Sequence, residues 1–332
     1  MCYIKFEHID KNYGNQHILK DLSLNIHKQE FVTLLGPSGC GKSTLLRCLA
    51  GLETISSGKI FLDGEDITHK KPAQRNVGMV FQQYSLFPTM NIYNNIAFGL
   101  KIKGYKKQEI DELVKDALKM VNLEGSEKKY PSQLSGGEQQ RVAICRCVVT
   151  KPKVLLLDEP FSAIDAKLRK SLQTRIKEIH RKIGMTTIFV THDQDEAMTM
   201  SDTIHLINKG VIEQSGTPTQ LYATPKNHFA ASFMGNYNIL DKNIVKAIAN
   251  AHISSQEICF RPEVVELSET SFDKDDDSLV LSGNVVDVIP QGNTIIYKIK
   301  CGDVIIKVSI LFDSFVNYNL TTNIYMKIKT II

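Results

Sequence analysis

One segment, residues 36–44, constrains the fold of this chain more than any other. It reads Gly-Pro-Ser-Gly-Cys-Gly-Lys-Ser-Thr and matches the pattern G-x-x-x-x-G-K-[ST]. The apolar residues 31–35 precede it, and a helical pattern over residues 43–50 follows it. Such a loop between a strand and a helix wraps the phosphates of a nucleotide in backbone N–H groups, while its lysine reaches the β and γ oxygens and its serine takes Mg²⁺. The residues expected at the phosphates are Gly36, Pro37, Ser38, Gly39, Cys40, Gly41, Lys42, Ser43 and Thr44.

A second glycine-containing segment, residues 134–141, reads Leu-Ser-Gly-Gly-Glu-Gln-Gln-Arg and opens a helical pattern over residues 138–149. The start of this helix offers a second set of free N–H donors at the positive end of a helix dipole. One nucleotide cannot use both helix ends within one chain. The alternative is an ordinary helix start, with Ser135 as the N-cap and a flexible glycine pair after it.

Taken together, the two segments resemble those of ATP-binding cassette (ABC) proteins, in which residues 134–141 match the signature sequence. From the amino terminus to about Gly235 the chain resembles the ATPase subunits of bacterial ABC importers. The resemblance implies that the second helix end binds the γ-phosphate of ATP held by a partner chain, so that a homodimer forms two sites head to tail. The residues that it assigns to this contact are Ser135, Gly136, Gly137 and Gln139.

Two carboxylates follow an apolar run within residues 151–160, which read Lys-Pro-Lys-Val-Leu-Leu-Leu-Asp-Glu-Pro. An unbroken apolar run predicts a central parallel strand with both faces covered. Asp158 and Glu159 then lie at the carboxyl end of that strand, where open α/β sheets place their ligands. Two acids that end a buried strand are also a common surface arrangement. The resemblance implies that Asp158 holds Mg²⁺ and that Glu159 polarises the water attacking the γ-phosphate, as in an ATPase.

The resemblance assigns three more residues. His192 follows the apolar residues 186–191 and matches the switch histidine that hydrogen-bonds the γ-phosphate, although a lone histidine after a strand is more often a turn residue. Gln82 matches the glutamine that contacts Mg²⁺ and the attacking water, and residues 84–88 abut the membrane subunit in importers. Tyr13 matches the aromatic residue that stacks on adenine, and packing on the sheet is nearly as good an interpretation of it.

The composition limits the partners and the compartment of the protein. The chain has 40 basic and 36 acidic residues, and a net charge of +4 is too weak a field to indicate nucleic acid as a partner. Seven cysteines without a C-x-x-C pair indicate free thiols in a reducing compartment. No apolar run reaches the ~18 residues of a membrane span, and the first residues do not form a signal peptide. We therefore expect a cytoplasmic protein.

Two domains are expected in the 332 residues. Over residues 1–235, strands alternate with helical patterns, which predicts an α/β P-loop ATPase domain of the ABC type with an inserted helical subdomain. Over residues 236–332, short β-rich runs separated by turns predict a small all-β, barrel-like domain. Residues 260–263, Phe-Arg-Pro-Glu, resemble the start of the regulatory (TOBE-like) domain of importers. The acidic residues 273–277 predict a solvated loop, with metal binding as an alternative.

The resemblance therefore implies an ATP-hydrolysing subunit of an ABC importer that uses ATP and Mg²⁺ and lies at the cytoplasmic face of the cell membrane. Its expected partners are a second copy, integral-membrane permease subunits and, indirectly, an extracytoplasmic solute-binding protein. Ferric ion, polyamine and phosphonate-type substrates all remain open. Two alternatives are a soluble ABC ATPase that acts on nucleic acid, suggested by the barrel-like domain, and an exporter ATPase, whose relatives usually lack that domain.

Overall fold

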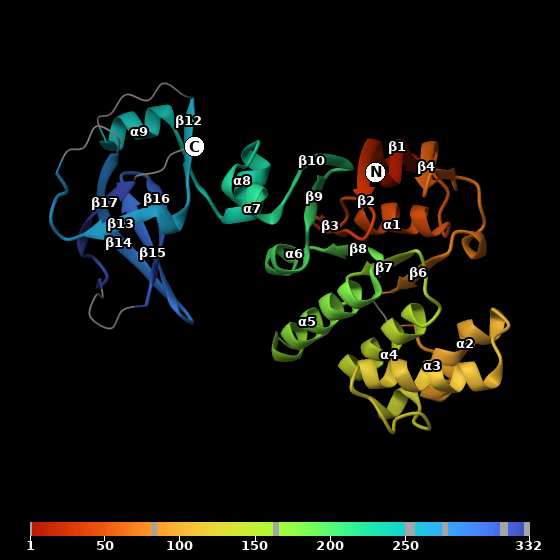
Figure 1. The fold of residues 1–332 in the computed structure, drawn as a ribbon. Coiled ribbons are helices and arrows are strands. Elements are labelled where there is room, and N and C mark those ends of the chain that lie inside the picture. Colours follow the sequence, from red (N-terminus) through yellow and green to blue (C-terminus); the bar gives the residue numbers. More distant parts are fainter. Residues whose placement is uncertain are drawn as a thin grey trace. The chain divides into compact units, whose positions relative to one another are not determined.

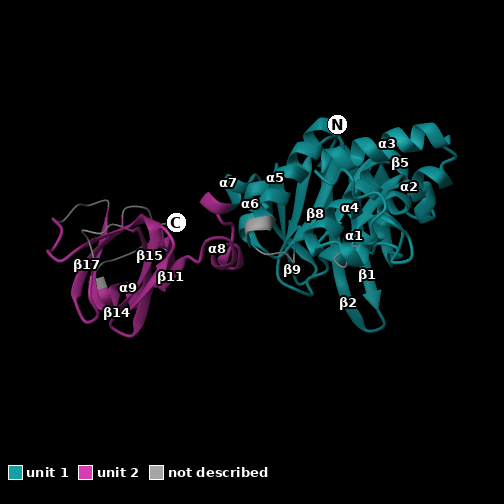
Figure 2. Ribbon diagram, turned by 90° about the horizontal axis from the view of Figure 1, so that it is seen from below, with its two compact units in different colours: residues 1–221 teal, residues 222–332 magenta. Residues whose placement is uncertain are grey.

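The chain divides into two compact units, residues 1–221 and 222–332 (Figure 2). The structure is a computed structural model that describes residues 2–81, 85–161, 166–249, 256–273, 278–312 and 318–328. The division falls earlier in the chain than the boundary expected after residue 235. Among the helices of the described residues, none has both the length and the apolar character that crossing a membrane requires.

A six-stranded sheet forms the centre of the first unit (Figure 1). Its order is β10-β9-β3-β8-β7-β6, and all neighbours are parallel except β10 and β9. The strands are β3 (Phe31–Leu35), β6 (Val77–Val80), β7 (Val154–Asp158), β8 (Thr186–Thr191), β9 (Thr203–Asn208) and β10 (Val211–Gly216). Every residue of β3, β7 and β8 is buried, because both faces of these strands are covered.

Alternate side chains of the sheet enter two different cores. Val32 and Leu156 pack with α1 (Lys42–Ala50) and with a second, antiparallel sheet. Phe31 and Leu155 pack with the helices of the opposite face. The antiparallel sheet has the order β2-β1-β4-β5. Its strands are β1 (Cys2–Tyr13), β2 (Gln16–His27), β4 (Ser57–Leu62) and β5 (Glu65–Asp66).

Three helices, α2, α3 and α4, pack on one another between β6 and β7 in the sequence (Figure 1). Together with α5 they share the core that covers the second face of the six-stranded sheet. This arrangement confirms the predicted helical insertion. The helical segments of this region and of the remainder of the unit are η1 (Pro72–Gln74), α2 (Ile92–Ile102), α3 (Lys107–Met120), η2 (Pro131–Gln133), α4 (Gly136–Val148), α5 (Ala166–Ile183) and α6 (Gln194–Met200).

The register of the central strands brings their carboxyl ends to one edge of the sheet. Leu35 of β3 lies opposite Thr191 of β8, and Asp158 of β7 lies opposite Val190 of β8. The segments that follow these three strands therefore begin at the same level. This edge is where an open α/β sheet presents its ligand-binding groups.

The second unit is built on a five-stranded antiparallel sheet of order β13-β17-β14-β15-β16. Strands β11 and β12, which come before these strands in the sequence, form a separate two-stranded antiparallel sheet. The strands are β11 (Asn238–Asp241), β12 (Glu257–Phe260), β13 (Val265–Ser268), β14 (Leu279–Gln291), β15 (Thr294–Cys301), β16 (Val304–Leu311) and β17 (Asn323–Ile328). The predicted β-rich, barrel-like domain is confirmed, and two helices accompany its strands. Val245 of α9 (Lys242–Ala249) enters its core, and α8 (His228–Gly235) precedes β11.

One side-chain amide joins the two sheets of this unit. The Asn238 side chain in β11 donates to the carbonyl of Lys307 in β16 at 2.8 Å and accepts from the Lys307 N–H at 2.8 Å. Lys307 lies on the outer strand of the five-stranded sheet. The asparagine therefore satisfies the backbone groups of an edge residue as a neighbouring strand would.

Tyrosine and arginine contacts explain why the second unit starts before residue 235. The carbonyl of Tyr222, in α7 (Pro218–Ala223), accepts from the Tyr237 hydroxyl at 2.8 Å and from the Arg261 guanidinium at 2.7 Å. The Tyr222 hydroxyl donates to Glu263 at 2.5 Å, and the guanidinium lies 4.0 Å from the centre of the Tyr222 ring. The segment before α8 is thus fastened to the residues that follow β12.

Candidate active site

The phosphate-loop candidate, residues 36–41, connects β3 to α1 and is closely packed at its two ends. Lys42 is only 4% exposed, and its ammonium group donates to the carbonyls of Gly36 and Pro37, both at 2.7 Å. Gly41 has a φ of +105°, and a Cβ there would lie 2.7 Å from Leu19 Cδ2. Gly41 is also the N-cap of α1 and supplies no side-chain cap. The backbone N–H groups of the first turn are therefore left for an anionic ligand.

Ser43 and Asp158 lie side by side where β3 and β7 end. The Ser43 hydroxyl donates to the Asp158 carboxylate at 2.6 Å, and the Arg47 guanidinium lies 3.8 Å from the other carboxylate oxygen. Burial raises the pKa of Asp158 above its usual range, while the Ser43 hydrogen bond and Arg47 oppose that rise. A hydroxyl and a buried carboxylate are oxygen donors of the kind that Mg²⁺ prefers. The chemistry of these residues fits the ion.

Glu159 and His192 face each other at the same edge. The Glu159 carboxylate lies 3.6 Å from Nδ1 of His192, which follows β8. The two residues line a small cavity of about 80 Å³ together with Phe161, Arg169 and Thr191. That volume is enough for a water molecule next to the carboxylate. Glu159 has a φ of +44°, a conformation that residues with a Cβ adopt rarely.

A hydrogen-bond network that sequence reasoning missed fixes the segment around His192. The Thr191 hydroxyl donates to the buried carboxylate of Glu196 at 2.5 Å and accepts from the Asp193 N–H at 3.0 Å. Asp193 caps α6 by accepting from the Glu196 N–H at 3.1 Å, and Arg169 of α5 lies 3.4 Å from Asp193. An aspartate before a helix is a capping signal, so the cap was detectable in the sequence. The Thr191–Glu196 bond was not.

Ser135 is the N-cap of α4, as the alternative interpretation of this segment expects. Its hydroxyl and the Glu138 carboxylate form a capping box, in which the Ser135 N–H donates to Glu138 at 2.8 Å. Gly136 is exposed, and a Cβ built on it would meet nothing within 4 Å. Gly137 is buried, and the Gln139 amide donates to the Leu134 carbonyl at 3.1 Å.

Tyr13 ends β1 and is 43% exposed, so its ring is not buried in the sheet. The Lys11 ammonium group lies 4.5 Å from the centre of the ring and also bonds to the Glu53 carboxylate at 3.1 Å and the Thr54 carbonyl at 2.6 Å. A nearly buried cation therefore lies over the Tyr13 ring.

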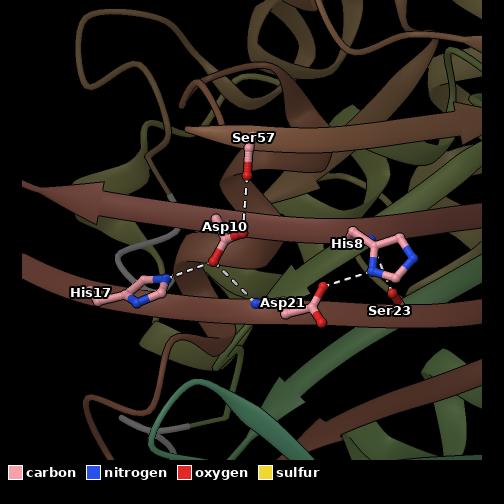
Figure 3. Close-up of polar contacts among 6 residues, drawn as sticks. All are labelled: His8, Asp10, His17, Asp21, Ser23 and Ser57. Atoms are coloured by element: carbon pink, nitrogen blue, oxygen red, sulfur yellow. Dashed lines mark hydrogen bonds and ion pairs between the residues drawn. The ribbon is translucent and has the colours of Figure 1, made fainter.

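Strand β1, which carries Tyr13, is tied to neighbouring strands by the carboxylate of Asp10 (Figure 3). It binds the His17 ring at 2.6 Å, the Asp21 N–H at 3.1 Å and the Ser57 hydroxyl at 2.9 Å. These contacts link β1 to both of its neighbours, β2 and β4. Two expected features lie outside the described residues: Gln82, with the start of the segment 84–88, and most of the acidic segment 273–277.

Fold and site together define the class: a P-loop ATPase in which the loop before α1, the acidic end of β7 and His192 lie at one edge of a parallel sheet. The sequence profile of the ABC transporter family matches residues 19–162. The spermidine/putrescine import ATP-binding protein PotA of Haemophilus ducreyi is 44% identical over 318 residues, which cover 90% of this chain and 85% of that protein. The protein belongs to the ABC transporter family, as one of its ATPases.

Two further similarities cover smaller shares of the chain. The Fe(3+) ions import ATP-binding protein FbpC 1 of Pectobacterium atrosepticum is 46% identical over 279 residues, 80% of this chain and 79% of that protein. A solved dimeric structure of the ATP-binding cassette MJ0796 in a post-hydrolysis state, bound to ADP and Pi, is 31% identical with a TM-score of 0.59. It covers 65% of this chain and 98% of that one.

Proposed function

We propose that this ATPase drives the import of a small cationic solute through separate membrane subunits. The observation that carries the proposal is similarity along almost the whole chain, including the second unit, to import ATP-binding proteins. Polyamines are the first substrate class to test, because relatives that match nearly 90% or more of the chain are named for spermidine and putrescine. Ferric ion is the second.

The proposed chemistry uses the groups at the sheet edge. The N–H groups of residues 36–44 and the Lys42 ammonium hold the phosphates of ATP, while Ser43, Asp158 and Gln82 would hold Mg²⁺. When bound, that ion would neutralise charge on the β- and γ-phosphates. Glu159 polarises the water that attacks the γ-phosphate and accepts its proton, and His192 hydrogen-bonds the γ-phosphate. Tyr13 would stack on adenine from the face that Lys11 leaves free.

The second part of each site comes from a partner copy in this proposal. Ser135, Gly136, Gly137 and Gln139 would contact the γ-phosphate held by the other chain, in a head-to-tail homodimer. The open surface around Gly136 supports this assignment, since it leaves the backbone accessible to a phosphate. In such a dimer ATP is enclosed between the two chains, and hydrolysis lets them separate.

The dimer would lie at the cytoplasmic face of the membrane on permease subunits that an extracytoplasmic binding protein supplies. Residues 84–88 would face those subunits. We assign ATP binding to residues 1–235 and a regulatory role to residues 236–332, with the segment from Tyr222 onward fastened to the regulatory part through Arg261.

The direct test is transport. The chain is tagged, its permease partners are co-purified from the native membrane, and the complex is placed in vesicles with MgATP on the side of the ATPase. We expect ATP-dependent uptake of labelled putrescine or spermidine, abolished by Glu159→Gln. If the vesicles take up ferric ion and neither polyamine, the proposed substrate becomes ferric ion. Active ATP hydrolysis without any co-purified membrane subunit would contradict the import function.

A further inference from the structure

The backbone of Glu159 is held in an uncommon conformation from two sides. Its φ of +44° lies in the left-handed region, which persists in non-glycine residues where the surroundings enforce it. On one side, the Glu159 N–H donates to the carbonyl of Val190 in β8 at 3.1 Å. On the other side, the carbonyl of the next residue, Pro160, accepts a hydrogen bond from a side chain of the signature helix α4.

That side chain is Gln140. It is completely buried, and its amide nitrogen donates to the Pro160 carbonyl. Its amide oxygen is also buried and has no hydrogen-bond partner among the described residues. Burying an amide with half of its hydrogen-bonding capacity unused is unfavourable compared with an apolar side chain of the same size. The bond to Pro160 is therefore the specific contribution that a glutamine makes at this position.

The residues around this bond leave little freedom for Glu159. Phe161 follows Pro160, is buried, and packs with its ring centre 5.6 Å from that of Phe189 in β8. The segment after β7 is thus bounded by β8 on one side and by α4 on the other. Within it, the Glu159 carboxylate reaches to 3.6 Å from His192.

We propose that Gln140 is a positioning residue for Glu159: its hydrogen bond to Pro160 holds the carboxylate in the orientation needed to polarise the attacking water. The inference rests on the catalytic role proposed for Glu159. Gln140 lies in the helix that Ser135 caps, so the same helix bears the proposed contact for one ATP and the support for the base at the other.

The test is Gln140→Met in the full chain, which keeps the volume of the side chain and removes the donor. A misplaced catalytic group costs up to ~100-fold in rate, so we expect kcat for ATP hydrolysis to fall ~10- to 100-fold while KM stays within about twofold. The matched control is Cys145→Ala. Cys145 is buried in the same helix, and its thiol donates to the Ala117 carbonyl of α3 at 3.2 Å. It should lower the melting temperature and leave kcat unchanged.

A double variant separates positioning from general damage. If Gln140 acts through Glu159, adding Gln140→Met to Glu159→Gln should cause no further loss of the residual rate. Two outcomes would overturn the inference about Gln140 and leave the proposed function intact. One is a further loss of rate in the double variant equal to the loss that Gln140→Met causes in the wild-type background. The other is a wild-type kcat for Gln140→Met. Full turnover by Glu159→Gln would overturn the proposed function as well. If Gln140→Met fails to fold, Gln140→Asn is the second variant. It keeps an amide group, but its side chain is too short to reach the Pro160 carbonyl, so the same loss of kcat is expected.

Discussion

The two glycine-containing helix starts of the first unit differ in what surrounds them. In the loop before α1, a Cβ on Gly36 would lie 2.0 Å from the Ile207 carbonyl oxygen, and one on Gly41 would lie 2.7 Å from Leu19. At the start of α4, a Cβ on Gly136 would meet nothing within 4 Å. The first loop needs glycine for the packing of its own chain. Gly136 has no such need, which favours a role toward something outside the chain.

The caps of the two helices differ in the same sense. Gly41 offers α1 no side-chain cap, so the first N–H groups of that helix depend on a ligand. Ser135 and Glu138 form a capping box on α4, so that helix start is satisfied without one. The start of α1 therefore has N–H groups that a ligand could satisfy, whereas the start of α4 is capped by its own side chains.

The prediction with the largest expected effect asks whether the start of α1 in one chain and the start of α4 in another form a single ATP site. Homodimers of Lys42→Ala or of Ser135→Arg should each lose ATP turnover by ~100-fold or more, because each lacks groups at the γ-phosphate. Mixing the two variants should restore part of the turnover, since one site of the heterodimer keeps both Lys42 and Ser135. Steady-state hydrolysis of the mixture measures this. An inactive mixture with verified heterodimers would contradict a shared site or require both sites to work together.

Gly41→Ala tests the packing of the first loop. Alanine at a φ of +105° is strained, and its Cβ would press on Leu19, so we expect the first unit to lose roughly 2–5 kcal/mol of unfolding free energy. Urea unfolding and calorimetric ATP binding measure the change. Gly39→Ala is the control, because its φ is also positive, at +81°, but its Cβ would have open space. Equal losses in the two variants would show that backbone strain alone, and not packing, requires glycine at residue 41.

The strand beneath the first loop should also respond to acid. Ile207, whose carbonyl lies under Gly36, belongs to β9, and so does His205, which burial shifts to a pKa of about 4. This pKa lies below that of a histidine in the unfolded chain. The contribution of neutral His205 to the free energy of unfolding is therefore fully present above pH ~6.5 and is lost as the pH falls toward 4, by up to about 3 kcal/mol. His205→Gln should flatten this pH dependence in urea unfolding. The exposed His27→Gln should leave it unchanged, and a flat wild-type profile would exclude the effect.

Gly136→Ala should have the smallest effect on stability and still impair function. Alanine favours a helix over glycine by up to about 1 kcal/mol, and the site has room for its methyl group, so the first unit should become slightly more stable. If Gly136 contacts a phosphate held by the partner, as proposed, ATP turnover should fall, because the added methyl group would keep that phosphate from the backbone. Thermal unfolding and hydrolysis on one preparation decide this. Unchanged turnover would remove Gly136 from the shared site.

The sequence was sufficient for the parts of the site that depend on local backbone geometry. The loop and helix start at residues 36–44 follow from glycines and a lysine that lie within a few residues of one another. Asp158 and His192 meet at one edge because parallel buried strands end together. Two side-chain hydrogen bonds depend on the folded structure, and no residue spacing in the sequence predicts them. They join Gln140 to Pro160 and Thr191 to Glu196.

The point at which the chain divides into compact units depends on a contact that is distant in sequence. The predicted boundary followed a change in composition near residue 235, whereas the contact that places Tyr222 in the second unit joins it to Arg261, far along the chain. Arg261 and Glu263 stood in the segment that resembled the start of a regulatory domain. Their contacts with Tyr222, a hydrogen bond to Glu263 and a cation–π contact with Arg261, can be found only in the three-dimensional structure.

The amide of Asn238 has a consequence for how the second unit can meet another protein. An outer strand with free N–H and C=O groups invites a foreign strand to extend the sheet. At Lys307 both groups are already bound by Asn238, so strand extension is blocked at the middle of β16. A second copy or a regulator that docks at the β16 edge must therefore recognise side chains there, and its affinity at this edge will depend on their shape and charge instead of on backbone pairing.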